Sequence, residues 1–192
     1  KGQVSIEISD PKLNPRFVLG LVRGVEARPS PYWVQRRLTL AGMRPINRIV
    51  DSTNYAMLEL GEPLHAFDYD VLVKRAGGAA PTIITRAALP VEHLTTLDNV
   101  DRKLDDFTIM VTDTAGALSL AGVMGGLESE VTPETKNVLL EGATWNFINT
   151  RRTVKSQKLP SEAAYRFERG VHPQMAVEGV QLGMERMAAW SG

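Results

Sequence analysis

The chain has 192 residues, and its 22 Lys and Arg are balanced by 22 Asp and Glu, so its formal net charge at pH 7 is zero. This length allows one domain with a substantial core and is barely enough for two. The absence of cysteine excludes disulfides, thiolate metal sites and cysteine nucleophiles, and it fits a cytoplasmic location. The balanced charge argues against a protein that neutralises many phosphates, although contact with a short end of a nucleic acid is compatible with it.

Two further classes of protein are disfavoured. The three histidines are far apart and have no metal-ligand spacing, so we expect no metal site. No apolar run approaches the length of a membrane span, so we expect no membrane association. The chain begins at Lys1 within a strand-like pattern, and we therefore expect residues 1–192 to be a single domain excised from a longer protein.

The first 42 residues predict two strands and a helix. Residues 1–10 alternate between apolar and polar side chains, which is typical of a half-buried strand, and residues 17–25 form a second strand candidate. Ser30 is a suitable N-cap, and Pro31 suits the first position of a helix because it lacks an N–H. Gly42 is expected to end that helix.

A second helix is expected after a short strand. Residues 47–51 read as the strand, and the cap-type residues 51–53 precede a helix over 55–60 that stops at Gly61. The residue before Pro63 is biased toward an extended conformation. Residues 74–81 are rich in Gly and Ala and read as a loop.

The remainder of the chain predicts a run of short strands followed by helices. The expected strands are 82–86, 94–97, 107–113, 117–121 and 138–141, separated by turn residues. Residues 145–158 read as a helix with a basic, solvated face, and residues 173–190 as a final helix. Strands and helices are segregated rather than alternating, which predicts an α+β fold with mixed or antiparallel sheets and flanking helices.

Thr53, Asn54 and His65 are polar side chains able to handle a small polar ligand. Helix capping is an equally good explanation for Thr53 and Asn54. A lone histidine among apolar neighbours is more often a core residue bonded to a backbone carbonyl than a functional one. The residues alone leave these alternatives open.

Glu141 and a glycine-rich stretch are the other candidates. Glu141 follows three apolar residues of a predicted buried strand, so it either leaves the strand into solvent or lies against a ligand. Burying it without a partner would cost several kcal/mol or raise its pKa. The stretch 121–126 contains three glycines, which permit close approach to the backbone or simply form a tight loop. It lacks the Lys-Ser/Thr of a phosphate loop.

Four sequence blocks in a fixed order carry a family resemblance. They are DSTNYAMLELGEPLHAFD from Asp51, LAGVMGG from Leu120, VLLEGA from Val138 and SEAAYRFERGVHP from Ser161. Together they resemble the B3/B4 region of the β subunit of bacterial phenylalanyl-tRNA synthetase, over about residues 17–190. The specificity lies in the set, because LAGVMGG alone would be a weak signal.

The resemblance implies an editing domain that hydrolyses tyrosine wrongly esterified to tRNA(Phe). It places three catalytic residues near the ester, namely His65, Thr53 and Asn54. It places the tyrosine-binding group around the ring and its hydroxyl: Glu141, Ala121, Gly122, Gly125 and Ala163. The expected reaction is direct attack by water, since no triad is visible to activate a side-chain nucleophile. His65 either orients or deprotonates that water, and N–H groups of 122–126 stabilise the oxyanion.

The resemblance also implies the setting of the domain. The expected partners are the tRNA(Phe) acceptor end, tyrosine and the α subunit of a heterotetramer. No cofactor is expected in this domain, because ATP and magnesium serve only the full synthetase. Two other hypotheses stay open, namely a non-catalytic module that scaffolds the subunit or holds the acceptor end, and a related fold in a stand-alone or tRNA-modifying enzyme.

Two positions depart from the family pattern. Ala164 stands where the family commonly has serine, and His172 where it commonly has aspartate. Both are expected to lie beside the pocket rather than in it.

Overall fold

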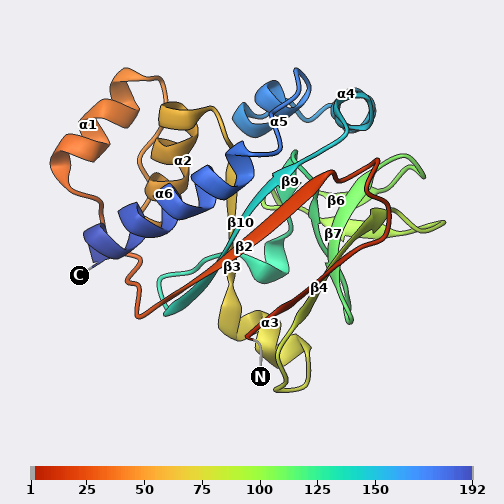
Figure 1. The fold of residues 1–192 in the computed structure, drawn as a ribbon, viewed down its shortest axis with the longest axis horizontal. Helices are drawn as coiled ribbons and strands as arrows, with labels where there is room; N and C mark the ends of the chain where they lie inside the picture. Colours follow the sequence, from red (N-terminus) through yellow and green to blue (C-terminus); the bar gives the residue numbers. More distant parts are fainter. Residues whose placement is uncertain (1–2, 192) are drawn as a thin grey trace.

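A computed structural model describes residues 3–191, and it confirms the α+β fold (Figure 1). The described residues form a five-stranded sheet, a three-stranded sheet and a small two-stranded sheet. In Figure 1 three helices (α1, α2 and α6) lie together on one side of the molecule, and the strands β4, β6 and β7 lie on the opposite side. The three-stranded sheet runs between these two groups.

The five-stranded sheet has the order β1-β4-β7-β8-β9. β1 is parallel to β4, and the other neighbours are antiparallel. Its strands are β1 (Ser5–Ile8), β4 (Thr82–Ala87), β7 (Ile109–Asp113), β8 (Gly116–Leu120) and β9 (Met124–Gly125). A separate hairpin pairs β5 (His93–Thr95) with β6 (Asp101–Lys103).

The three-stranded sheet places β10 (Asn137–Thr144) between β2 (Arg16–Arg23) and β3 (Leu64–Asp68), antiparallel to both. Every residue of β10 after Asn137 is buried, as expected for a central strand that is covered on both faces. α6 (Met175–Ser191) packs against β10 and β2. Gly142 permits this contact, because a Cβ atom there would lie 2.7 Å from Val180 Cγ2.

Five further helices complete the fold. They are α1 (Tyr32–Leu40), α2 (Arg48–Leu60), α3 (Tyr69–Arg75), α4 (Phe147–Gln157) and α5 (Glu162–Phe167). A 3-10 turn, η1, spans Leu127–Ser129. The expected helices over 145–158 and 173–190 are therefore confirmed as α4 and α6.

The expected strand over 47–51 is wrong, because the second helix begins there. Asn47 is the N-cap of α2, and its side chain accepts hydrogen bonds from the N–H groups of Ile49 and Val50, both at 3.0 Å. The expected cap residues 51–53 lie inside the helix instead. Gly61 ends α2 with φ of 76°, as predicted.

Ser30 is not the cap of the first helix. α1 has Pro31 at its N-cap position and no side-chain cap bond. The Ser30 hydroxyl instead donates to Asp51 Oδ2 at 2.6 Å, and the N–H of Ile46 donates to Oδ1 at 2.8 Å. Burial raises the pKa of Asp51, and these two hydrogen bonds oppose that shift. Ser30 therefore satisfies a buried carboxyl rather than a helix end.

Several element boundaries also differ from expectation. The expected loop over 74–81 begins inside α3, and the strand expected over 107–113 begins only at Ile109. The first strand is shorter and more exposed than a half-buried strand, since Ile6 is 44% exposed. Lys1 and Gly2 of that expected strand lie outside the described residues.

Asn14 joins the two larger sheets. Its side-chain amide donates to the carbonyl groups of Arg16 and Thr144 at 2.8 and 2.9 Å. Its Oδ1 accepts from the Thr85 hydroxyl at 3.1 Å. Because Thr85 lies on β4 and Thr144 ends β10, one buried side chain is hydrogen-bonded to both of the larger sheets.

Candidate functional site

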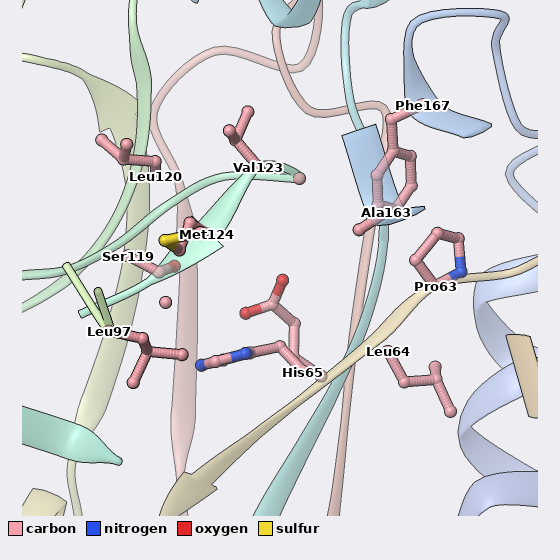
Figure 2. A pocket seen from close by; sticks show the side chains of 13 residues that line it. Pro63, Leu64, His65, Leu97, Ser119, Leu120, Val123, Met124, Ala163 and Phe167 are labelled. Carbon is pink, nitrogen blue, oxygen red and sulfur yellow. The ribbon is translucent and has the colours of Figure 1, made fainter. Parts of the chain in front are cut away.

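A cavity of about 200 Å³ lies between the ends of the two sheets and α5 (Figure 2). Its lining is mostly apolar, and the exceptions are Ser119, His65 and Glu141. The lining residues come from β3, β8, β9, β10, α5 and the loops beside them: Pro63, Leu64, His65, Leu97, Ser119, Leu120, Gly122, Val123, Met124, Gly125, Glu141, Ala163 and Phe167. Segments far apart in sequence therefore build one pocket.

Glu141 and His65 are direct partners in the register of β10 and β3. Directly opposed residues of antiparallel strands project their side chains from the same face of the sheet, so both reach the same cavity. The Glu141 side chain is 6% exposed, and its Oε2 is buried with no hydrogen-bond partner among the described residues. Burial raises the pKa of Glu141 to about 8. The alternative prediction, that the Glu141 side chain leaves the strand into solvent, is therefore wrong.

His65 carries no hydrogen bond to either ring nitrogen within residues 3–191, which the structure describes. Its ring meets the edge of Phe67 at a centroid distance of 4.4 Å, and in Figure 2 it points away from β3 toward Leu97. Apolar surroundings lower the pKa of His65 to about 4, so the imidazole is neutral at pH 7. The alternative of a core histidine bonded to a backbone carbonyl therefore finds no support.

The two glycines predicted to line the pocket do so for different reasons. A Cβ atom on Gly125 would overlap Cε1 of His65 and lie 3.2 Å from Leu97 Cδ1. Gly122 has a positive φ of 69°, and a Cβ there would lie 2.6 Å from Trp145 Cδ1. Gly125 thus makes room for the imidazole, and Gly122 lets the turn after β8 pack on the core.

Backbone hydrogen bonds reduce the number of N–H groups in residues 122–126 that are free to stabilise an oxyanion. The N–H of Val123 donates to the Leu120 carbonyl at 3.0 Å, and that of Gly126 donates to the Leu118 carbonyl at 2.8 Å. These two N–H groups are therefore not free for a ligand, which corrects part of the expectation. Gly122 lies outside the strands, and its N–H has no backbone partner within residues 3–191.

α5 closes the cavity with Ala163 and Phe167 (Figure 2). The hydroxyl of Ser161 caps this helix by accepting from the Ala164 N–H at 3.0 Å. The same hydroxyl donates to the Val123 carbonyl at 2.8 Å. One side chain therefore ties the start of α5 to the glycine-rich turn.

Comparison with known proteins places the chain in a family. The sequence profile of the B3/4 domain matches residues 13–190. The chain belongs to the B3/4 domain family. Relatives of this B3/4 domain include the phenylalanine–tRNA ligase beta subunit of Moorella thermoacetica, which is 47% identical over 191 residues. The beta subunit of Nocardia farcinica is 46% identical over 178 residues.

This B3/4 domain corresponds to only part of those relatives. The alignments cover 100% and 92% of the chain but 23% and 20% of the two beta subunits. A solved N-terminal fragment of the phenylalanyl-tRNA synthetase beta-subunit from Pyrococcus horikoshii has a TM-score of 0.54 and 17% identity. That match covers 82% of this chain and 49% of the fragment, and it supports the fold alone.

Three residues predicted for the site are not among those that line the cavity of this B3/4 domain. Thr53 and Asn54 lie on α2, and the Thr53 hydroxyl donates to the Val50 carbonyl at 2.7 Å. Ala121 is 3% exposed and packs in the core beside the turn. The structure thus brings together five of the eight predicted residues in the lining of one cavity, and the roles of all eight stay predictions.

The two departures from the family pattern both lie outside the cavity lining. Ala164 is 1% exposed and packs in the core, whereas His172 is exposed and its Nδ1 accepts from the Gln174 N–H at 3.2 Å.

Glu62 is a buried carboxyl that sequence reasoning missed. It is fully buried between α6 and β10, and its Oε1 accepts from the Ala143 N–H at 3.1 Å. Its Oε2 has no partner among the described residues. Burial raises the pKa of Glu62 to about 8, and the charge of Glu141 adds to the shift. The only sequence signal was a carboxylate directly before Pro63.

The described part of this B3/4 domain contains neither a cluster of metal-binding side chains nor a membrane-spanning helix. Residues 3–191 contain no group of three or more His, Cys, Asp or Glu side chains arranged to hold a metal ion. Over the same residues, no helix is both long and apolar enough to cross a membrane.

Proposed function

We propose that this B3/4 domain hydrolyses the ester of tyrosine mischarged onto tRNA(Phe), as the editing site of a phenylalanine–tRNA ligase. The observation that carries the proposal is the pairing of Glu141 with His65 across β10 and β3 inside an apolar cavity. An unpaired buried carboxyl and a neutral imidazole are unusual in apolar surroundings, because both forgo hydrogen bonds that water would provide. Perturbed titratable groups in a cleft are candidates for function.

Glu141 supplies the selectivity for tyrosine. A tyrosine hydroxyl gives the buried Oε2 a hydrogen-bond partner that none of the described residues supplies. Phenylalanine would enter the same space and leave that oxygen unpaired. Sites built around a substrate hydroxyl reject the analogue without it by roughly 10⁴–10⁵. The selectivity of this cavity is therefore opposite to that of a pocket that prefers phenylalanine.

The apolar wall supplies the space for the aromatic ring. Ala163 has the smallest side chain that α5 places in the cavity, and Phe167 offers a ring edge or face beside it. Enlarging residue 163 would fill the space needed by the ring, because close-packed sites tolerate added volume poorly.

His65 acts at the ester end by holding the attacking water. A neutral imidazole has one acceptor nitrogen, which can orient a water or take its proton. The free N–H of Gly122 is the donor that the turn offers to the developing oxyanion. Thr53 and Asn54 are proposed to support this end from α2. The reaction is direct hydrolysis, in which water attacks the ester carbonyl and the tRNA ribose hydroxyl leaves.

The proposal places the domain within a larger enzyme. The relatives are beta subunits several times longer than this chain, so the α subunit, tRNA(Phe), ATP and magnesium belong to the whole ligase. A cytoplasmic location is part of the same proposal.

Two measurements test the proposal together. Calorimetry should detect tyrosine binding to the domain and no phenylalanine binding at the same concentration. The assembled ligase should deacylate Tyr-tRNA(Phe) and spare Phe-tRNA(Phe). Equal binding of the two amino acids would remove the selectivity role of Glu141, and binding without deacylation would favour the non-catalytic module.

A further inference from the structure

α4, α5 and the segment between them carry a surplus of basic residues. Residues 146–170 contain six Lys and Arg against two Glu, a local charge of +4 in a chain whose net charge is zero. The six are Arg151, Arg152, Lys155, Lys158, Arg166 and Arg169. Among residues 3–191, no carboxylate lies within ion-pair distance of the first four. These charges are therefore available to a partner.

Aromatic rings accompany the arginines on this surface. Tyr165 is 56% exposed, and the guanidinium of Arg169 lies over its ring at 3.6 Å from the centroid. Phe147 is 43% exposed, and the guanidinium of Arg151 lies 5.0 Å from its centroid. We call these four residues the arginine–aromatic surface. Each arginine covers one face of its ring and leaves the opposite face uncovered.

The two pairs belong to one continuous surface. Nε of Arg151 on α4 donates to the carbonyl of Glu168 at 2.6 Å, and Arg169 is the next residue. Figure 1 shows α4 and α5 side by side above the strands. A hollow of about 390 Å³ lies between the two helices, and Glu162, Tyr165 and Glu168 are among the residues that line it.

A single helix, α5, lies between the arginine–aromatic surface and the candidate site. Ala163 and Phe167 line the cavity, whereas Tyr165, between them in sequence, is exposed. A helix is roughly 10 Å across, so the arginine–aromatic surface and the cavity are separated by about that thickness. A chain lying on α5 can therefore enter the cavity at its end.

We infer that the arginine–aromatic surface binds the single-stranded 3′ end of the tRNA whose esterified amino acid enters the cavity. The inference rests on the proposed function, which it extends by assigning where the RNA lies. Single-stranded RNA is held by aromatic and guanidinium planes that stack on bases and by cations that contact phosphates.

The test uses the assembled ligase and paired variants. Tyr165→Ser removes an exposed ring from this surface, and Tyr32→Ser is its control because Tyr32 is 80% exposed on α1, distant in sequence from α5. Arg151→Gln removes one charge, and Arg36→Gln on α1 is its control. Each variant is checked for assembly and thermal unfolding before its kinetics are measured.

The inference predicts a specific kinetic pattern. For deacylation of Tyr-tRNA(Phe), Tyr165→Ser should raise KM about tenfold, as expected for the loss of one stacked base, and leave kcat within about twofold. Arg151→Gln should reduce the slope of log KM against log salt by about 0.7, the contribution of one phosphate contact. Binding of free tyrosine should be unchanged, and neither control should alter KM.

The possible failures are distinguishable. A wild-type ligase that deacylates normally, with Tyr165→Ser and Tyr32→Ser showing the same KM, overturns the assignment of this surface. A loss of ligase assembly in Tyr165→Ser but not in Tyr32→Ser also overturns it, since the surface then contacts another part of the enzyme. A wild-type ligase that does not deacylate overturns the proposed function and this inference with it.

Discussion

His65 occupies the space that a Cβ atom of residue 125 would need. A methyl group on Gly125 would overlap Cε1 of the imidazole and lie 3.0 Å from its Nε2. The backbone of Gly125 has no positive φ, so the strand itself accepts an alanine. The conflict is therefore between one side chain and the ring, in the part of the cavity where water is proposed to be held.

Gly125→Ala should lower the rate of Tyr-tRNA(Phe) deacylation without unfolding the domain. Displacing a group that positions water by about 1 Å can cost on the order of 10²-fold in rate. Gly125→Trp should abolish deacylation, because the indole would also meet Leu97. The measurements are single-turnover deacylation by the assembled ligase and thermal unfolding of each variant. Unchanged deacylation in Gly125→Trp would remove Gly125 from the site.

Glu141→Ala should reduce discrimination between tyrosine and phenylalanine more than it reduces deacylation itself. The substitution removes the acceptor proposed for the tyrosine hydroxyl and the penalty for leaving it unpaired. We expect the ratio of Tyr-tRNA(Phe) to Phe-tRNA(Phe) hydrolysis rates to fall by about 10² or more. Glu130→Ala is the matched control, because that glutamate is exposed. A ratio that stays at the wild-type value would separate Glu141 from recognition of the hydroxyl.

The sequence allowed the α+β class and five of the residues that line the cavity to be predicted, but not how the cavity is assembled. Residues 138–141 and 173–190 follow clear apolar patterns, and the structure confirms both elements. Residues 47–51 were predicted to be a strand, because Ile49 and Val50 favour strands, but the Asn47 cap starts a helix there.

The remaining differences arise from contacts between residues far apart in the chain. Leu97 reaches the cavity because its N–H donates to the Gly125 carbonyl at 3.1 Å, a pairing that no local pattern contains. The same holds for Glu62, whose acceptor role depends on Ala143 of β10. Residue identity indicated the chemistry of the site, whereas long-range pairing determined which apolar residues surround it.

The stability of the domain should fall as pH rises from about 6.5 to 8. Glu62 and Glu141 each have a folded pKa of about 8 against an ordinary value of 4.5. In this window the unfolded chain has released these protons and the folded domain retains them, so raising the pH favours unfolding. Each carboxyl contributes at most about 1.4 kcal/mol per pH unit.

His65 makes the fall in stability shallower below about pH 6.5 than above it. Its folded pKa of about 4 lies below the ordinary 6.5, so between these values its neutral folded form is favoured as pH rises. That effect opposes the carboxyl effect below 6.5 and is absent above it. Urea unfolding of the domain at several pH values measures the slope. Glu141→Gln and Glu62→Gln should each reduce it, and the exposed control Glu130→Gln should not.

Asn14→Ala should destabilise the domain strongly, because this side chain connects the two sheets that form the cavity. The substitution leaves the carbonyl groups of Arg16 and Thr144 and the hydroxyl of Thr85 without these partners. Unpaired buried polar groups cost about 1–3 kcal/mol each, and relaxation recovers part of that, so we expect a loss of about 3 kcal/mol in unfolding free energy.

The matched control for Asn14 is Asn137→Ala. It also removes an amide side chain, but its contact with the Asp70 carboxylate is exposed. Exposed contacts of this kind contribute less than about 1 kcal/mol. Urea unfolding followed by tryptophan fluorescence measures both variants, and Trp145 reports on the cavity side of the core. Equal losses for the two would show that the sheets are held by apolar packing rather than by Asn14. A larger loss for Asn14→Ala, accompanied by weaker tyrosine binding, would show that the cavity depends on this link between the sheets.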